Sequence, residues 1–254
     1  MRKLIVLILF VLLATAGFAQ VKIHSHNDYV QKQQFSLAFQ NKVYQIEADI
    51  FEVNGEAIVA HSKKEIDIKQ TLNKLYLNKI DSLFKLNKGK VSNDKNYTFT
   101  LMIDFKTSWD ATFPAFQKHI EKYGEIFNRS KNKKAVQIVI SGNRPADSMY
   151  HTFPSWVYFD GLPNISYAKA DLKRVTMISD NFASYSKWKG IGEIPAEDKA
   201  KLKKIIEQAH KLNKAMRFWG APDTQDCWRQ LIDLGADIIN TDKIVECKTY
   251  FEHK

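Results

Sequence analysis

The chain has 254 residues, a formal net charge of +10, 44% hydrophobic residues and only two cysteines. Two cysteines exclude a disulfide scaffold and any multi-cysteine zinc module, and the hydrophobic content is that of a globular protein rather than a disordered chain. The length suits one or two domains, and single α/β barrels commonly occupy about 250 residues.

The positive charge is spread along the chain rather than gathered into one basic stretch. Its two densest runs, at 131–134 and 199–204, are short, and the second has the apolar spacing of an amphipathic helix with a solvated face. No zinc-finger or RNA-binding signature accompanies them. We therefore expect no nucleic-acid partner and interpret the charge as a basic surface that favours solubility and at most attracts anionic substrates.

Residues 1–19 have the organisation of a secretory signal peptide. Two basic residues precede an unbroken apolar run at 4–13, and small residues lead up to Ala19. The run is too short to span a bilayer comfortably, and no cysteine for lipid attachment follows it. We expect cleavage after Ala19, export to the periplasm or the extracellular space, no stable membrane insertion, and a single domain at 20–254.

From there the chain alternates predicted strands and helices. Amphipathic helix patterns separate most of the strands, and no linker or fixed-period repeat divides the sequence. This alternation predicts a (β/α)₈ TIM barrel. The fifth and sixth strands are separated by irregular sequence, so a distorted or incomplete barrel is the alternative. The eight predicted strands are 21–26, 43–51, 97–105, 135–140, 156–159, 174–178, 215–219 and 236–240.

Acidic residues stand at the carboxyl ends of two predicted strands, where barrels of this kind carry their chemistry. Glu47 and Asp49 lie two residues apart and so point to the same side of their strand, towards the barrel axis. Asp104, on the next barrel strand, adds a third carboxylate. Three oxygen ligands suit one divalent cation, Mg²⁺ or Ca²⁺, better than zinc. The alternative is that these carboxylates are simply paired with Lys106 or another cation.

Histidines follow the first two strands. His24 and His26 lie at the end of the first strand, and His61 follows a short apolar stretch at 57–60 that is expected to form a hairpin with the second strand. A His-x-His pair also begins the barrels of metal-dependent amidohydrolases, but those require further histidines where this chain has aspartates. We therefore keep an amidohydrolase as an alternative and expect His24 to form hydrogen bonds beside the site.

At these positions the chain resembles the superfamily of glycerophosphodiester phosphodiesterases and phosphatidylinositol-specific phospholipase C-like phosphodiesterases, in particular a bacterial branch with a His-Asn-Asp-Tyr motif. The matching motifs occur in the expected order over nearly all of the predicted domain. They are His26-Asn27-Asp28-Tyr29, Glu47-x-Asp49, His61, Asp104-Phe105-Lys106, Arg217-Phe218-Trp219 and the run 235–242.

The resemblance implies roles for these residues. His26 and His61 would be the general acid/base pair, and the carboxylates Glu47, Asp49 and Asp104 would hold the divalent cation. Two histidines suit these roles because the ordinary imidazole pKa of about 6.5 allows both proton uptake and release near neutral pH.

The resemblance also implies substrate contacts, and here the chain departs from the family pattern. Lys106 would contact a phosphate oxygen or steady the metal ligands. Asn27 stands where the glycerophosphodiesterases usually have an arginine, and Arg144 is the residue that would replace its charge. Trp219, at the end of the seventh strand, would form a wall of the substrate pocket; packing in the core is its alternative. Asp104 stands where the family commonly has the longer glutamate.

Three other features have two interpretations each. Cys227 and Cys247 would form a disulfide in an exported protein, or would pack as separate thiols. Asp242 is expected to cap the final helix rather than take part in the chemistry. The segment 179–195 carries three aromatic residues, which would form a lid over the substrate or simply cover the barrel.

These expectations describe an exported, metal-dependent phosphoric diester hydrolase that acts on a glycerophosphodiester or a phospholipid-derived head group. If a hydroxyl of the substrate is the nucleophile, a cyclic phosphate forms first, as in a phospholipase C-like enzyme. The alternative outside catalysis is an exported barrel that binds a phosphorylated or carbohydrate ligand. A binding protein needs no acid/base pair, which favours the enzyme.

Overall fold

The computed structural model describes residues 21–253. The expected signal segment at 1–19 lies outside the described residues. None of the helices within 21–253 is both long and apolar enough to cross a membrane.

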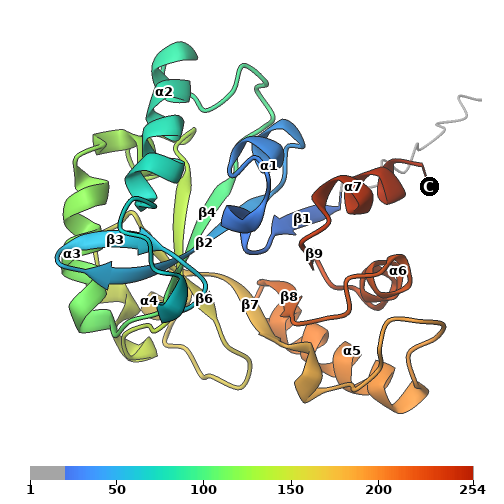
Figure 1. The fold of residues 1–254 in the computed structure, drawn as a ribbon. Helices are drawn as coiled ribbons and strands as arrows, with labels where there is room; N and C mark the ends of the chain where they lie inside the picture. Colours follow the sequence, from blue (N-terminus) through green and yellow to red (C-terminus); the bar gives the residue numbers. More distant parts are fainter. Residues whose placement is uncertain (1–20, 254) are drawn as a thin grey trace, which may run out of the picture.

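Eight parallel strands close into a barrel, as predicted (Figure 1). Hydrogen-bonded neighbours follow the order β1-β9-β8-β7-β6-β5-β4-β2, and pairing of β2 with β1 closes the ring. A further strand, β3 (Glu56–Val59), pairs antiparallel with β2 and forms the hairpin expected there. The barrel strands are β1 (Lys22–Ser25), β2 (Gln45–Val53), β4 (Thr100–Phe105), β5 (Gln137–Gly142), β6 (Val157–Gly161), β7 (Val175–Asn181), β8 (Ala215–Trp219) and β9 (Ile238–Thr241).

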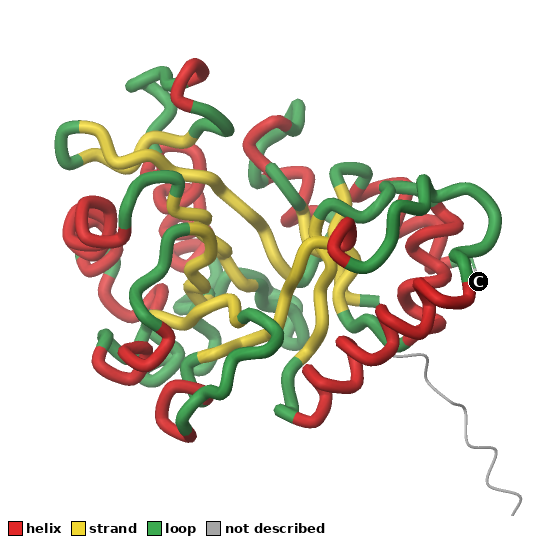
Figure 2. Tube along the Cα trace, turned by 90° about the horizontal axis from the view of Figure 1, so that it is seen from below, coloured by secondary structure: helices red, strands yellow, loops and turns green. Residues whose placement is uncertain are grey.

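Helices surround the strands (Figure 2), with α2 and α3 on one side of the barrel and α5, α6 and α7 on the other (Figure 1). A turn of π-helix at Asn73–Leu77 leads directly into α2. The α-helices are α1 (Ser36–Gln40), α2 (Asn78–Leu86), α3 (Trp109–Glu121), α4 (Lys169–Leu172), α5 (Ala196–Lys211), α6 (Gln225–Leu234) and α7 (Ile244–Glu252).

The barrel interior has an apolar floor and a polar upper layer. Met102, Val139, Met177 and Ile238 form a small buried cluster separate from the large core between strands and helices. Two residues further along each of these strands, and therefore on the same side, the side chain is polar. These four polar side chains are Asp104, Ser141, Ser179 and Asn240. The floor excludes water from below, and the layer above it presents charge at the carboxyl ends of the strands.

The barrel is closed, and its irregularities are local. The register between β6 and β7 shifts between Phe159 and Asp160, which are in one of the two strands expected to be weak. Within the described residues, β8 and β9 form a register pair only at Arg217 and Ile238, whereas β9 and β1 pair at four positions. One irregularity therefore lies in the part of the barrel that the sequence marked as irregular, and the other lies between the last two strands, where the sequence shows no such sign.

The last part of the chain contains helix α6 and both cysteines. Helix α6 begins at Gln225, because the Thr224 hydroxyl caps it by accepting a hydrogen bond from the Cys227 amide. The two cysteines are buried and free, so they do not form the disulfide.

The aromatic segment at 179–195 covers the barrel rather than forming an exposed lid. Phe182 is buried, and both Phe182 and Tyr185 contact the ring of Phe218 edge to face. These contacts are typical of core packing. These aromatic residues therefore cover the barrel and do not form a lid over the substrate.

Candidate active site

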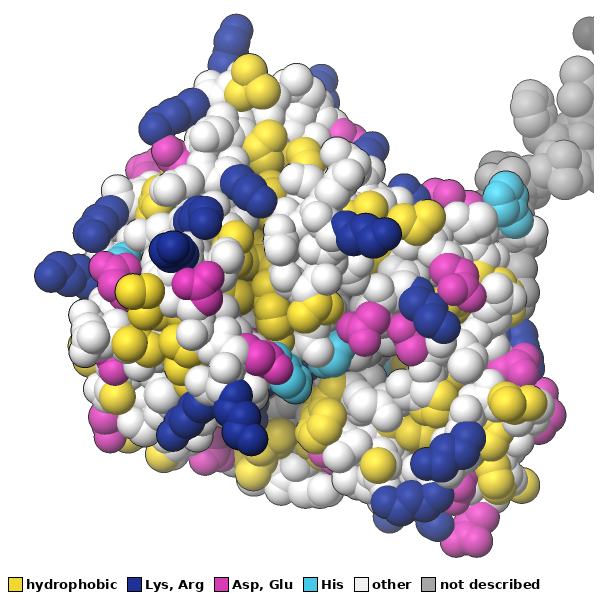
Figure 3. Space-filling model, in the orientation of Figure 1, with side chains coloured by type: hydrophobic (Ala, Val, Ile, Leu, Met, Phe, Trp, Pro, Cys, Tyr) yellow, Lys and Arg dark blue, Asp and Glu magenta, His cyan; other side chains and the backbone are white. Residues whose placement is uncertain are grey.

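A cavity of about 390 Å³ opens at the carboxyl ends of the barrel strands. Eight of the nine site residues proposed from the sequence line it, and the ninth, Asp49, lies buried against Lys106. The eight are His26, Asn27, Glu47, His61, Asp104, Lys106, Arg144 and Trp219. On the face drawn in Figure 3, histidine side chains lie together near the centre beside acidic ones, while Lys and Arg are spread over the face.

Glu47, Asp49 and Asp104 form a compact carboxylate cluster. One oxygen of each lies within 4.8 Å of the others, because β2 and β4 run parallel with Asp49 level with Asp104. Burial, and next the charge of Glu47, raise the pKa of Asp49 to about 6. Among the described residues, Asp49 Oδ1 is buried without a hydrogen-bond partner. Clustered, partly unsatisfied carboxylate oxygens are the donor set that a hard divalent cation uses, so these residues could hold one.

Lys106 satisfies part of this cluster. Its Nζ lies 2.9 Å from Asp49 Oδ2 and 3.3 Å from Asp104 Oδ1. Burial lowers the pKa of Lys106, but the two carboxylates outweigh that effect and raise it. Lys106 therefore forms the ion pairs expected as the alternative to metal binding, with Asp49 and with Asp104. It leaves Asp49 Oδ1 unsatisfied and does not reach Glu47, whose partners lie on the other side.

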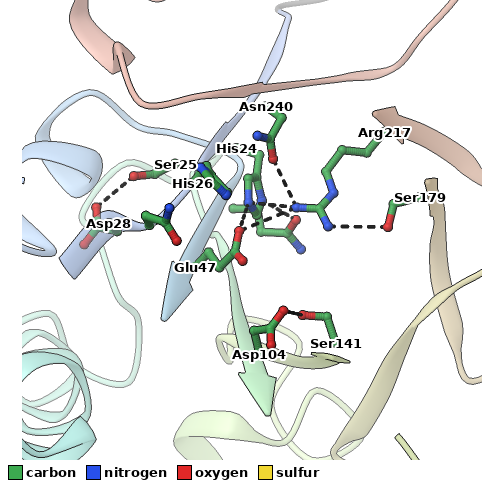
Figure 4. A network of polar contacts seen from close by, with 12 residues as sticks. His24, Ser25, His26, Asp28, Glu47, Asp104, Ser141, Ser179, Arg217 and Asn240 are labelled. Carbon is green, nitrogen blue, oxygen red and sulfur yellow. Dashed lines mark hydrogen bonds and ion pairs between the residues drawn. The ribbon is translucent and has the colours of Figure 1, made fainter. Parts of the chain in front are cut away.

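Glu47 is held by His24 and Arg217, which point towards it in Figure 4. His24 Nε2 lies 2.5 Å from Glu47 Oε2, and His24 Nδ1 lies 2.7 Å from Gln45 Oε1. Burial, then Arg217, lower the pKa of His24 to about 4. Burial alone would raise the pKa of Glu47, but the contacts with His24 and Arg217 hold it below its usual range.

These contacts give His24 the hydrogen-bonding role expected for it. Both of its ring nitrogens are occupied by protein groups, so His24 and His26 do not form a pair of metal ligands. Asp160, which stands where an amidohydrolase requires a histidine, accepts from Ser179 and Arg217. The geometry does not support the amidohydrolase alternative.

Arg217 links the two halves of the barrel interior. Its guanidinium is buried, with Nη2 3.1 Å from Asp160 Oδ2. Its Nη1 lies 3.3 Å from Asn240 Oδ1 (Figure 4). Arg217 also lies 3.6 Å from Glu47 Oε2. One arginine thus compensates carboxylates on opposite strands, β2 and β6. It also lines the cavity, where it adds positive charge near the carboxylate cluster.

His26 is oriented by Asp242. The His26 Nδ1 lies 2.9 Å from Asp242 Oδ1. Burial lowers the pKa of His26, but the bond to Asp242 and the charge of Glu47 outweigh it and raise the pKa. The expectation that Asp242 caps α7 is wrong, since no side chain caps that helix. Because Nδ1 is occupied, Nε2 is the His26 nitrogen left for proton transfer to a ligand.

His61 is oriented through Tyr29. The Tyr29 hydroxyl lies 3.2 Å from His61 Nδ1 and donates to Asp49 Oδ2 or Asn27 Oδ1, each 2.8 Å away. Burial, followed by the Asp49 charge, raises the pKa of this phenol, so it stays protonated. Tyr29 therefore connects the carboxylate cluster to the second histidine, whose Nε2 is left for substrate.

Asn27 and Asp28, the other two residues of the His-Asn-Asp-Tyr motif, shape the loop after β1. Asn27 has φ +44°, a left-handed conformation that asparagine tolerates better than most side chains. Asp28 is buried and accepts from the Ser25 hydroxyl, the Phe35 amide and the Tyr76 hydroxyl. These bonds fix the loop that carries His26 and Tyr29.

Arg144 and Trp219 lie on the cavity wall. Arg144 donates from Nη1 to the backbone carbonyl of Asp160, which holds the arginine beside the cavity. Trp219 is 42% exposed, which excludes the core-packing alternative for it.

The sequence patterns include Tyr29, Asp242 and Arg217 but did not predict the contacts that these residues make in the site. For Arg217 a signal existed, because a charged residue inside the apolar strand 215–219, two residues before Trp219, must point into the barrel. For Tyr29 and Asp242 there was none, since their partners lie 32 and 216 residues away in the chain.

Comparison with known proteins agrees with this geometry. A protein from Arthroderma benhamiae named "Altered inheritance of mitochondria protein 6 homolog" is 22% identical over 93% of this chain and 86% of its own length. "Altered inheritance of mitochondria protein 6" of Eremothecium gossypii is 24% identical over 88% of this chain and 67% of its own length.

Solved structures show the same fold. A glycerophosphodiester phosphodiesterase from Parabacteroides distasonis matches with a TM-score of 0.56 and 13% identity, over 92% of this chain and 97% of its own. A glycerophosphodiester phosphodiesterase from Agrobacterium tumefaciens matches with a TM-score of 0.52 and 13% identity, over 91% and 99%. Residues 14–160, more than half of the sequence, match the model of one family, and the chain therefore belongs to the AIM6-like phosphodiesterase domain family.

Proposed function

We propose that this protein hydrolyses phosphodiesters, with His26 and His61 as the proton-transfer pair and a divalent cation, Mg²⁺ or Ca²⁺, held by Glu47, Asp49 and Asp104. The observation that carries the proposal is that both histidines line the same cavity as the carboxylate cluster. A cation bound there neutralises charge on the non-bridging oxygens of the phosphate. Lys106 adds a fixed positive charge beside it.

In the proposed reaction, His61 Nε2 takes the proton from the attacking hydroxyl as its oxygen forms a bond to phosphorus. His26 Nε2 gives a proton to the leaving oxygen as its bond to phosphorus breaks. His26 suits the acid role because Asp242 favours its protonated form. When the attacking hydroxyl belongs to the substrate, the first product is a cyclic phosphate that water opens in a second step.

We propose a glycerophosphodiester or a phospholipid-derived head group as the substrate. The similar solved structures are named glycerophosphodiester phosphodiesterases, and the cavity is of a size suited to a small diester. Asn27 supplies no charge where the resembling enzymes have arginine. In this proposal Lys106, Arg144 and Arg217, which line the cavity, provide the positive field instead.

The test is hydrolysis of a panel of glycerophosphodiesters and p-nitrophenyl diesters, with Mg²⁺ or Ca²⁺ and with chelator. His26→Ala and Glu47→Ala are each expected to lose activity by at least ~100-fold, as expected for loss of acid/base or metal catalysis. His253→Ala, at an exposed position near the chain end, is the control and should keep full activity. Retention of activity by both site variants, with native thermal stability, would overturn the assignment.

We also propose that residues 1–19 direct export and are removed, so that the domain at 20–254 acts in the periplasm or outside the cell. The support is the basic, apolar and small-residue order of that segment. Expression in a bacterial host, followed by fractionation and N-terminal sequencing, should give exported protein that begins at Gln20. Cytoplasmic protein with an intact N-terminus would contradict this.

A further inference from the structure

A second cavity, of about 350 Å³, adjoins the candidate active site. It shares the lining residues Gly142, Arg144 and Leu162 with the first cavity, so the two cavities adjoin at these residues. Its walls come from two loops that follow neighbouring barrel strands, 143–147 after β5 and 162–167 after β6. A diester whose phosphate lies in the first cavity would therefore have the second cavity beside one of its arms.

The walls of the second cavity combine apolar and polar residues, and two of its aromatic rings are held in place. Pro145, Ala146 and Ile165 line it together with the rings of Tyr150 and Tyr167. The Tyr150 ring stacks on Phe159 with centroids 3.8 Å apart, and the Tyr167 hydroxyl accepts from the Leu162 amide at 2.8 Å. Apolar walls with a few fixed polar groups are typical of binding pockets for organic groups.

The charges around this cavity are placed unevenly. Arg144 stands at the junction with the first cavity, where an anionic phosphate would lie. Asp147 also lines the second cavity, and no ion pair or hydrogen bond to its carboxylate occurs within residues 21–253. An uncompensated carboxylate in a pocket repels an anionic group that enters it.

We propose that the second cavity is a subsite for one alcohol arm of the diester, and that it selects a bulky arm with an apolar face and no anionic group. This proposal rests on the proposed phosphodiesterase function and adds the class of substrate arm to it. Apolar walls favour the bulk of the arm by burying its surface, and Asp147 disfavours arms that carry a phosphate or a carboxylate.

The first experiment measures binding, so that it does not depend on turnover. Diphenyl phosphate and dimethyl phosphate are titrated by calorimetry, in the presence of Mg²⁺, into the wild type, Ala146→Trp and Ser148→Trp. Ala146 lines the cavity and is exposed, so an indole there fills the pocket without disturbing the core; Ser148 is exposed nearby but does not line it.

The wild type and Ser148→Trp are expected to bind diphenyl phosphate at least ~10-fold more tightly than dimethyl phosphate. Ala146→Trp should lose that preference while its affinity for dimethyl phosphate stays unchanged. Equal preference in Ala146→Trp and the wild type, or no preference in the wild type, would overturn the subsite.

The second experiment addresses the charge. Asp147→Asn is expected to bind phenyl 4-carboxyphenyl phosphate several-fold more tightly than the wild type does, with no change for diphenyl phosphate. Asp233→Asn, which removes one surface charge in the last turn of α6, is the control. An equal effect of both variants contradicts the role of Asp147.

Failure of the subsite and failure of the enzymatic function give different results. Binding that depends on Ala146, without hydrolysis of any diester, would refute the phosphodiesterase and support the subsite. Hydrolysis that requires His26 and Glu47, with the same preference for arms in the wild type and Ala146→Trp, would support the phosphodiesterase and refute the subsite.

Discussion

The hydroxyl of Tyr29 links residues from different strands and loops into one site. It joins Asp49, in the middle of β2, to His61, after the β2–β3 hairpin, and to Asn27 in the loop after β1. A phenol kept protonated by burial and neighbouring carboxylates can hold a histidine in place without adding charge. In this respect it resembles the outer-shell partners of metal and catalytic sites.

We expect Tyr29→Phe to lower kcat or divalent-cation affinity by about 10–100-fold, the usual loss when an outer-shell hydrogen bond is removed. Steady-state kinetics and a cation titration would measure it. Tyr123→Phe removes one tyrosine hydroxyl bond, to Asn78 on the helical surface, and should leave both quantities unchanged. If the two variants behave alike, Tyr29 has no part in the site.

Asp242 sets the charge state of His26. Because the Asp242 bond raises the pKa of His26 against the effect of burial, we expect Asp242→Asn to lower that pKa. If His26 is the general acid, the loss of activity on the basic side should then begin at a lower pH. NMR titration of the imidazole and a pH–rate profile would measure both effects.

Asp237→Asn is the matched control for Asp242→Asn. Asp237 bonds His210 at 2.8 Å in the same type of pair, and the variant should not move the titration midpoint of His26. An unchanged His26 midpoint in Asp242→Asn would contradict the role given to Asp242.

At the scale of elements, the end of β5 is shaped to make room for the end of β4. Gly142 has φ +68°, and a Cβ atom there would lie 2.3 Å from Asp104 Oδ1 and 2.6 Å from the Phe105 carbonyl oxygen. A side chain at this position therefore collides with a carboxylate of the cluster and with backbone. The strand ends approach so closely because β4 and β5 pair through Asp104 and Phe105.

We expect Gly142→Ala to lose more stability than Gly192→Ala, which has the same φ of +68° but no atom within 4 Å of its added Cβ. Backbone strain costs each variant about 1–2 kcal/mol, and the collision adds roughly 1–3 kcal/mol at Gly142. Urea unfolding would measure the difference. Activity should fall only in Gly142→Ala, because it displaces Asp104; equal losses in both would mean that strain alone matters.

At the scale of the whole molecule, folding itself assembles the carboxylate cluster. Asp104 is 57 residues after Glu47 in the numbering, and the parallel pairing of β2 with β4 brings their oxygens to within 4.8 Å. An unfolded chain offers no such site, so a cation that binds there stabilises only the folded state.

We expect saturating Mg²⁺ or Ca²⁺ to raise the Tm and chelator to lower it. At 100 times the Kd the gain is about 2.7 kcal/mol, which corresponds to roughly 5–10 °C for a domain of this size. Differential scanning calorimetry would measure it. Asp104→Asn keeps the shape of the side chain but removes one charged ligand, and should reduce the shift; an undiminished shift would place the cation elsewhere.

Much of the architecture could be predicted because it follows from local pattern. The two-residue alternation in β2 set Glu47 and Asp49 on the inner face, and the apolar strands with their intervening helices led to the barrel. Exact helix boundaries, such as the start of α6 at Gln225, depend on a capping side chain, here that of Thr224, and follow less directly from the pattern.

The sequence by itself determined the order of strands, the residues that face the barrel axis and the family to which the motifs belong, because each of these depends on neighbours within a few positions. Only the tertiary structure decided which inward groups compensate one another: Glu47 with His24 and Arg217, Asp49 with Lys106 and Tyr29. The physical reason is that ion pairs and hydrogen bonds act over a few ångströms, and folding alone brings together side chains that are far apart in the chain.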